Sequence, residues 1–436
     1  MTHPVISLKP SYNSLVRGCP GLPDTLPRLE CELRIRSSNG KRFIIGNIEV
    51  ILRTTEVLNS PGHSFTSKSK LERSVIHYKK NIRISDKKIV GIDIPLTIAL
   101  PDDIKETNFN SKFGHCFTTL ECVLTYSIQA NDTPTLTHPF STVVNVERYD
   151  LLASPKLFKP LKRKFTSPDG KFLVQYKIEN PCVTTDDVLH LGLEVVPKLN
   201  SNSFAHTQKI FGKKLKLKCV VFEVKEYLEV YDSHLDAKES TLQEVTKQFN
   251  EAIGDSGIVL QSDIRICTKN QRFKQYELSM KEPAVMYRLP THQPDLTGNL
   301  PETILLKSKN NIEPFNYHSS ITTRGKLFSI THGITMRFKI SSAKDFEINQ
   351  PIDISPWVKP QIKYIENIIY REKEIAKNAR AFYESFGGIK RNKKTGQLEY
   401  PPLPPVVYTS DEETLNHLGI EYNKKFNPPR RVPVIE

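Results

Sequence analysis

Apolar and polar residues alternate along several short stretches of the chain. In residues 29–36, Leu29, Cys31, Leu33 and Ile35 point one way and the charged residues between them point the other. The same period of two recurs in residues 120–128, 172–178 and 334–340. This period is typical of antiparallel strands that rest one face on a core. Turn residues such as Asn180-Pro181 end the runs, so the pattern predicts sandwiches of short strands rather than a parallel sheet.

The alternation is interrupted near residues 149–170. This stretch contains three prolines and the basic cluster Lys162-Arg163-Lys164, and it shows no sustained period. We interpret it as the passage between two domains. The predicted fold is therefore all-β, with two antiparallel β-sandwiches in tandem, one over residues 1–150 and one over residues 165–356.

Two stretches show a helical spacing instead. Residues 239–253 place Leu242, Val245, Phe249 and Ile253 on one stripe, which predicts a helix packed on the second sandwich.

After the last strand a longer helical stripe begins, within a segment that we assign to residues 357–388. Its members are Ile362, Ile365, Ile369, Ala376, Ala379, Tyr383 and Phe386. Pro360 suits the first turn of this helix and Gly387-Gly388 suits its C-terminal cap. We expect the helix to dock on the second sandwich. The alternative is that the stripe forms a dimer.

Residues 389–436 lack both periods and alternate basic, proline-rich and acidic blocks. Such a composition predicts a tail that is flexible or docked in extended form.

The composition narrows the class of protein. Hydrophobic residues make up 38% and charged residues 25% of the 436 positions, which excludes wholesale disorder. No stretch approaches the ~18 apolar residues of a membrane span, and the N-terminus lacks the layout of a signal peptide. These features predict a cytoplasmic protein.

No constellation of catalytic or metal-binding residues stands out. The seven cysteines are scattered without a CxxC pair, and the twelve histidines are dispersed. Glycine-rich phosphate loops, a GxSxG elbow and HExxH are all absent from the sequence. We therefore expect neither an enzyme nor a cofactor or bound metal.

The net charge of +14 calls for an anionic partner. Residues 156–220 carry 13 Lys or Arg against 5 Asp or Glu. Within residues 214–221, alternation predicts that Leu215, Leu217, Cys219 and Val221 face the core while alternate lysines face outward. We predict a basic recognition face made of Lys209, Lys213, Lys214, Lys216 and Lys218. A solvated edge that discourages aggregation is the alternative.

Three segments resemble the arrestin fold, and in particular the fungal arrestin-related trafficking adaptors of the alpha-arrestin family. Residues 15–56 resemble the strand, turn and strand that begin an arrestin N-domain. Residues 91–104 followed by 115–130 resemble its apolar strand, proline-bounded loop and long strand. Residues 329–341 and 346–357 resemble the closing strands of an arrestin C-domain. The resemblance covers about residues 1–356.

The resemblance implies a function. Such adaptors hold a HECT-type ubiquitin ligase through proline-tyrosine motifs that bind its WW domains, and they engage membrane transporters that are then ubiquitylated and endocytosed. Here the WW-ligand candidate is Pro401, Pro402, Leu403, Pro404, Pro405 and Tyr408, a segment suited to polyproline II. Its spacing departs from the family pattern, because two residues rather than one separate Pro405 from Tyr408.

A ligase held at this segment would reach lysines near the helix. The expected ubiquitin acceptors are Lys363, Lys373, Lys377, Lys390, Lys393 and Lys394. The resemblance further implies peripheral recruitment to the plasma membrane or endosomes, with transporter cytoplasmic tails as partners and anionic lipids as a further candidate.

Two other functions stay open at this point. One is an arrestin-fold scaffold or coat component, in signalling or sporulation, without ligase recruitment. The other is a nucleic-acid-binding β protein, which is disfavoured because no recognised motif accompanies the positive charge.

Overall fold

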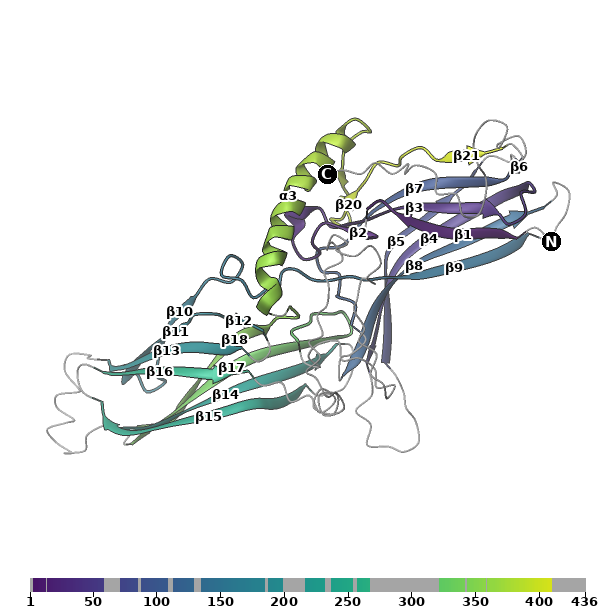
Figure 1. The fold of residues 1–436 in the computed structure, drawn as a ribbon. Coiled ribbons are helices and arrows are strands. Elements are labelled where there is room, and N and C mark those ends of the chain that lie inside the picture. The colour runs from purple at the N-terminus through teal and green to yellow at the C-terminus, as the bar shows by residue number, and fades with distance from the viewer. Residues whose placement is uncertain are drawn as a thin grey trace, which may run out of the picture.

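A computed structural model shows two β-sandwiches that follow one another along an elongated molecule (Figure 1). The structure describes residues 3–409 except 13, 59–70, 85–87, 109–112, 129–134, 185–186, 199–215, 232–236, 254–256, 267–320, 342 and 358. The tandem arrangement of antiparallel, arrestin-like sandwiches, followed by a helix towards the C-terminal end of the described residues, confirms the predicted fold class.

The first sandwich consists of two antiparallel sheets. One sheet, which we call sheet A, has the order β1 (Pro4–Pro10), β3 (Arg28–Ser37), β7 (Gly91–Ala99) and β21 (Val406–Tyr408), with β2 (Val16–Arg17) also beside β3. The other, sheet B, has the order β5 (Leu71–Ile82), β4 (Phe43–Leu58), β8 (Gly114–Ser127) and β9 (Leu136–Val144), with β6 (Lys88–Ile89) also beside β4. Its core contains Leu29, Cys31, Leu33 and Ile35, as their alternation predicts.

The second sandwich also has two sheets. Sheet C has the order β10 (Leu161–Thr166), β11 (Phe172–Ile178), β13 (Val188–Pro197) and β16 (Ile258–Arg265). Sheet D has the order β12 (Cys182–Val183), β18 (Phe346–Ile354), β17 (Phe328–Ser341), β14 (Lys216–Val230) and β15 (Lys238–Ala252). The β12–β18 pair is parallel and the other pairs are antiparallel. The alternating residues of β11 and β17 fill the core between the sheets.

The helix predicted over residues 239–253 is wrong, because this stretch is strand β15. Two register irregularities explain the misleading spacing. Leu242 and Phe249 each lie where the β14–β15 register shifts, and Asn250 adopts a left-handed backbone with φ of 57°. A bulge adds one residue to a strand and changes which side chains share a face. Leu242, Val245 and Phe249 therefore all pack against the core from a strand, although their spacing is helical.

A bulge also alters the pattern of β14. The register shifts between Leu217 and Cys219, so Lys218 is the extra residue. Leu217 lies in the core, but after the bulge Val220 and Phe222 take the core positions that alternation gives to Cys219 and Val221. The prediction that Cys219 and Val221 face the core is thus wrong.

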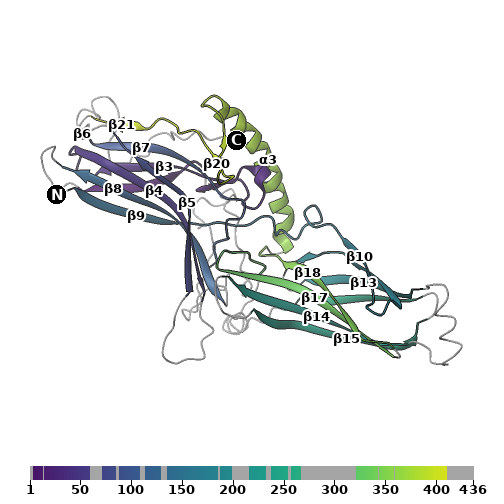
Figure 2. The same cartoon turned by 180° about the vertical axis from the view of Figure 1, so that it is seen from behind.

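The C-terminal helix forms where it is expected, as α3 (Ile362–Glu384), preceded by the short 3-10 turn η2 (Lys359–Gln361). The expectation that it docks on the second sandwich is wrong. Its apolar stripe packs against residues of the first sandwich and its exit, Cys19, Leu26, Tyr149 and Leu152, and against Trp357, which follows β18. The helix thus lies beside the junction of the two sandwiches in both views (Figures 1 and 2).

Beyond the helix the chain turns back along the first sandwich. A small hairpin of β19 (Lys390–Arg391) and β20 (Leu398–Glu399) leads into the proline-rich segment, and β21 then joins sheet A beside β7. Figure 1 shows this segment running over sheet A. Through residue 409 the tail is therefore docked in extended form.

Candidate interaction surfaces

A row of charged side chains lies on the outer face of sheet A, along β3. Arg28 donates to Glu30 at 2.6 Å, and Arg34 donates to Glu32 at 2.5 Å. Residues two apart share a face of a strand, so this row is the polar half of the alternation that builds the core. All four side chains are nevertheless buried. Buried charges are costly without partners, so the pairing within the row is what makes this burial tolerable.

Helix α3 and the hairpin cover the Arg28 end of the row. The Tyr383 hydroxyl lies 2.9 Å from Thr97 Oγ1 of β7, and the Tyr383 and Tyr400 rings meet edge to face at 5.0 Å. Burial raises the pKa of Tyr400 to about 12 and that of Tyr383 further still. A phenol is neutral at pH 7 even at its ordinary pKa of about 10, so both side chains cover the Arg28–Glu30 pair without adding charge.

The helix stripe contains one buried acid. Glu372 accepts a hydrogen bond from the Gly18 amide at 3.0 Å and lies 3.5 Å from the Arg17 guanidinium. A Cβ at position 18 would lie 2.6 Å from the Thr25 carbonyl oxygen, and Gly18 has a φ of 74°. Glycine is therefore required where the chain turns beneath the helix.

Strand β21 covers the other end of the row. The Tyr408 hydroxyl donates to Asp93 at 2.9 Å, and the Arg36 guanidinium lies 4.6 Å from the centre of the Tyr408 ring. Arg36 also forms an ion pair with Asp93. The tyrosine is thus held by a hydrogen bond and a cation–π contact in addition to the strand pairing.

A cavity of about 780 Å³ lies between the tail and the open side of the first sandwich. Its walls are residues 77–83 of β5 and the adjoining loop, residues 94–99 of β7, and residues from the hairpin to Pro405. The volume falls within the range of about 300–1,000 Å³ that is usual for ligand sites.

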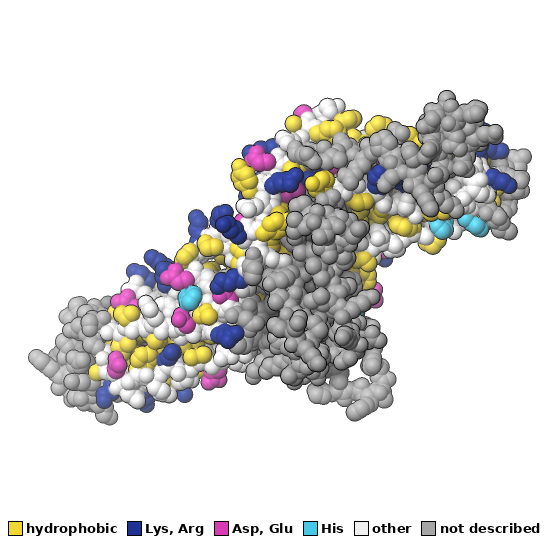
Figure 3. All heavy atoms as spheres, in the orientation of Figure 1, with side chains coloured by type: hydrophobic (Ala, Val, Ile, Leu, Met, Phe, Trp, Pro, Cys, Tyr) yellow, Lys and Arg dark blue, Asp and Glu magenta, His cyan; other side chains and the backbone are white. Residues whose placement is uncertain are grey.

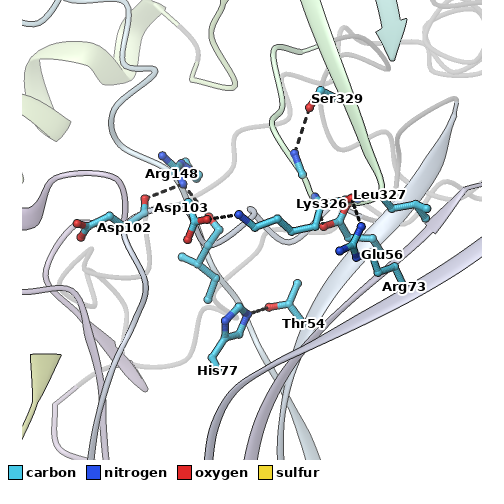
Figure 4. A network of polar contacts seen from close by, with 12 residues as sticks. Thr54, Glu56, Arg73, His77, Asp102, Asp103, Arg148, Lys326, Leu327 and Ser329 are labelled. Atoms are coloured by element: carbon cyan, nitrogen blue, oxygen red, sulfur yellow. Dashed lines mark hydrogen bonds and ion pairs between the residues drawn. The ribbon is translucent and has the colours of Figure 1, made fainter. Parts of the chain in front are cut away.

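A polar network joins the two sandwiches (Figure 4). The Glu56 carboxylate of β4 accepts the backbone amides of Lys326 at 2.7 Å and Leu327 at 3.1 Å. Lys105 lies 3.2 Å from the same carboxylate and 3.2 Å from the Phe328 carbonyl oxygen. The side chains of Glu56 and Lys105 are each only 3% exposed.

Apolar packing surrounds this network. Leu58 of the first sandwich packs with Leu228, Leu327, Phe328 and Ile330 of the second. On the helix side of the junction, the Trp357 indole donates to the Arg148 carbonyl oxygen at 2.8 Å and packs on Tyr149. These contacts join the two sandwiches on both sides of the junction.

The WW-ligand candidate is brought onto the first sandwich. Tyr408 is buried, Leu403 packs beneath the end of α3, and Pro402, Pro404 and Pro405 are exposed. A WW domain that needs the tyrosine together with the prolines would first have to release β21 from β7. Binding of this segment to a WW domain stays a prediction.

The lysines expected to accept ubiquitin lie on the helix and hairpin. Lys363, Lys377, Lys390, Lys393 and Lys394 are exposed, and Lys373 is paired with Asp24 at 2.8 Å. Their accessibility is compatible with modification, which stays a prediction.

The basic recognition face is described only in part. Lys209, Lys213 and Lys214 lie outside the described residues, whereas Lys216 and Lys218 begin β14 and are exposed. A second basic strip lies on β10, where Lys162 and Lys164 are exposed and share the outer face of sheet C. Figure 3 shows Lys and Arg side chains along this upper edge of the second sandwich.

Within the described ranges, no group of three or more His, Cys, Asp or Glu side chains is placed to hold a metal ion. No helix in the same ranges is long and apolar enough to cross a membrane. The described cysteines are reduced and buried, and burial raises the pKa of Cys122 to about 12.

Sequence reasoning missed the partners of the charged row and of Tyr408. One signal was present, since LECELRIR places Glu and Arg two apart on one face, a spacing suited to ion pairs along a strand. The Tyr408–Asp93 contact has no local signal, because the two residues are 315 positions apart.

Comparison with known proteins identifies a relative of this chain. No family model matches the chain. It is 41% identical to RHO1 GEF localizing protein 1 of Saccharomyces cerevisiae over 502 aligned positions, which cover 100% of both chains. Identity at this level over the full length shows common descent and a shared fold. The chain belongs to the family of RHO1 GEF localizing protein 1.

Proposed function

We propose that the protein is a non-catalytic scaffold that localises a guanine nucleotide exchange factor of a Rho1-type GTPase. The observation that carries this proposal is full-length identity to a relative whose name describes that role. The two sandwiches have an arrestin-like fold, so the proposal agrees with the scaffold function left open above.

The geometry supports a scaffold. Glu56 and Lys105 join the two sandwiches at a buried junction, so we expect surfaces on both to keep a defined relation to each other. A protein that localises another must bind it and an anchoring site at the same time, and a rigid junction keeps both surfaces available. In this function the protein works in the cytoplasm and is recruited peripherally to the plasma membrane or endosomes by its partners.

A trafficking adaptor of the alpha-arrestin type is the second function, and the proline-rich segment is the observation that favours it. The docking of Tyr408 opposes this function, because Asp93 and Arg36 hold the tyrosine on sheet A. Ligase recruitment would require the segment to leave this position. We therefore rank it behind the localising function.

The localising function is tested by removing the protein from cells and following a fluorescent Rho1 exchange factor. We expect the exchange factor to lose its localised enrichment in the cell, and the wild-type chain to restore it. Glu56→Ala, which unlocks the junction, should restore it poorly, whereas Glu49→Ala on the same strand should act like wild type. Normal enrichment without the protein would overturn the proposal.

The adaptor function is tested separately with a peptide of residues 396–412 and a WW-domain array. Saturable binding that is lost with Tyr408→Ala and with Pro404→Ala/Pro405→Ala would favour the adaptor. The full chain should then bind less tightly than the peptide, because Tyr408 is buried in it. If neither the peptide nor the full chain binds a WW domain, this segment does not recruit a ligase.

A further inference from the structure

The cavity beneath the tail lies where the open edges of both sheets of the first sandwich meet. Strand β5 is the edge of sheet B and pairs only with β4 among the described strands. Strand β7 pairs with β21 only at Gly91–Asp93, so residues 94–99 have no described strand on that side. Unpaired edges expose backbone N–H and C=O groups that can pair with an added strand.

The wall formed by β5 is positively charged on its inner side. Lys80 lies opposite Val50, whose side chain is in the core, so Lys80 is on the core-facing side of sheet B. Its neighbours on that side, Tyr78 and Ile82, pack against the core as expected for this register. Lys80 thus stands at a position of β5 where the alternation would place an apolar residue. It lies at the open edge of sheet B and lines the cavity.

The charges around the cavity do not cancel. Neither Lys80 nor Arg83 forms an ion pair with a described residue, whereas Lys79 is paired with Glu49 at 2.8 Å. Among the lining side chains that the structure describes, Glu399 is the one acid, and it accepts a hydrogen bond from Asn392 at 2.6 Å. The cavity therefore carries a net positive charge, which favours an anionic occupant.

The opposite wall is apolar and rigid. It is formed by the proline-rich segment, including Pro401, Pro402 and Pro405, with Leu403 packed beneath the helix. Prolines present no backbone N–H, so this wall offers surface without competing for strand pairing. A site with a free strand edge, an unpaired lysine and an apolar wall is suited to an extended chain with alternating carboxylates.

We propose that this cavity binds an extended acidic peptide segment of a partner protein, which adds as a strand to the free edge of β5. Backbone pairing with β5 supplies the affinity, and a carboxylate beside Lys80 and Arg83 supplies the specificity. This proposal goes beyond the localising function. It concerns any partner protein that carries an extended acidic segment, and it does not require that partner to be an exchange factor.

The experiment uses the purified full chain and a fluorescent ten-residue peptide of alternating Thr and Glu, with alternating Thr and Lys as control. We expect saturable anisotropy with the acidic peptide alone, weakened by salt. Lys80→Glu should weaken binding about tenfold or more, equivalent to about 1.4 kcal/mol. Lys247→Glu, an exposed lysine on β15 of the other sandwich, is the matched control and should bind like wild type.

Hydrogen exchange separates strand addition from loose charge attraction. Bound peptide should slow exchange of the amides of residues 77–83 and leave those of β1 unchanged. Unchanged binding in Lys80→Glu, or protection confined to β1, would overturn the proposal.

Two further results would assign the cavity to another occupant and so also overturn the proposal. The first is binding only after residues 410–436 are removed, because it would assign the cavity to the chain's own acidic segment Asp411–Glu413. The second is Lys80-dependent binding of phosphatidylserine vesicles without peptide binding, because it would assign the cavity to lipid. Since these tests use purified components, they are independent of the outcome in cells.

Discussion

The two sandwiches share an architecture but differ in what lies outside their sheets. On the first, α3 and the tail cover sheet A, and the charged side chains of β3 are buried down to 0% exposure at Arg28. On the second, the outer face of sheet C includes Val259 of β16, which is 71% exposed. Figure 3 shows side chains of all types on this bare face.

This difference shows that alternation predicts which side chains of a strand face the core. It does not predict whether the side chains on the other face are covered or exposed. Strands β3 and β11 both alternate, and their apolar halves fill the two cores. Their other halves differ, because β3 lies beneath the C-terminal segment and β11 does not. The charged row of β3 is therefore buried and paired within itself. On the outer face of β11 the side chains are only half-buried and lie beside the lysines of β10, and Lys177 is paired with Glu179.

The largest expected effect comes from unlocking the two sandwiches. Glu56→Ala leaves the buried Lys105 without its ion-pair partner, which costs about 3–5 kcal/mol for a buried pair. Chemical denaturation should show this loss and a separation of one unfolding transition into two. Glu49→Ala is the control, since its partner Lys79 is about half exposed and the pair contributes less than about 1 kcal/mol. Equal losses in both variants would contradict a junction held by Glu56.

The next effect tests the cover on the first sandwich. Tyr383→Ala removes a fully buried ring from the face of α3 that packs on sheet A. This change should lower the free energy of unfolding by about 3–5 kcal/mol. Thermal unfolding measures it, and the loss should fall on the first sandwich. Tyr370→Ala on the same helix is 69% exposed and should change stability by no more than about 0.5 kcal/mol. A loss at Tyr370 as large as at Tyr383 would place the packed face of the helix elsewhere.

A smaller effect is expected where β21 docks. Tyr408→Phe keeps the ring over Arg36 but removes the hydrogen bond to Asp93, worth about 1.5–3 kcal/mol for a charged acceptor. Because β21 can open alone, hydrogen exchange at Val90, whose amide donates to the Tyr408 carbonyl, should accelerate about tenfold or more. Val407→Ala, with its side chain partly exposed, is the control. Unchanged exchange at Val90 would show that the hydroxyl does not hold the strand.

The smallest effect is at the rim of the junction. The Lys326 ammonium, 2.5 Å from Asp103, holds the pKa of that carboxyl below its ordinary value. A lowered pKa stabilises the fold above about pH 4, and this contribution disappears as pH falls through the pKa of the folded state. Both side chains are more than half exposed, so Asp103→Asn should cost less than about 1 kcal/mol at pH 7. Denaturation at pH 7 and pH 3.5 checks the trend, and a cost that grows at low pH would contradict it.

The sequence by itself determined the fold class, several of the longer strands and the C-terminal helix. These features depend on a period of two or of 3.6, which follows from the geometry of strands and helices and can be read over a few residues. The same local reading fails at β15, where two bulges turn strand residues into a helical spacing. A bulge is defined by the partner strand, so it is invisible in the sequence of one strand.

Only the tertiary structure decided where the helix and tail dock and which surfaces remain free. The stripe of α3 is apolar whichever sandwich it meets, and the pairing of Tyr408 with Asp93 joins residues 315 positions apart. The cavity beside Lys80 likewise exists only because β5, β7 and the tail converge. Such contacts depend on shape and charge assembled from distant segments, and no short-range pattern encodes which segments will meet.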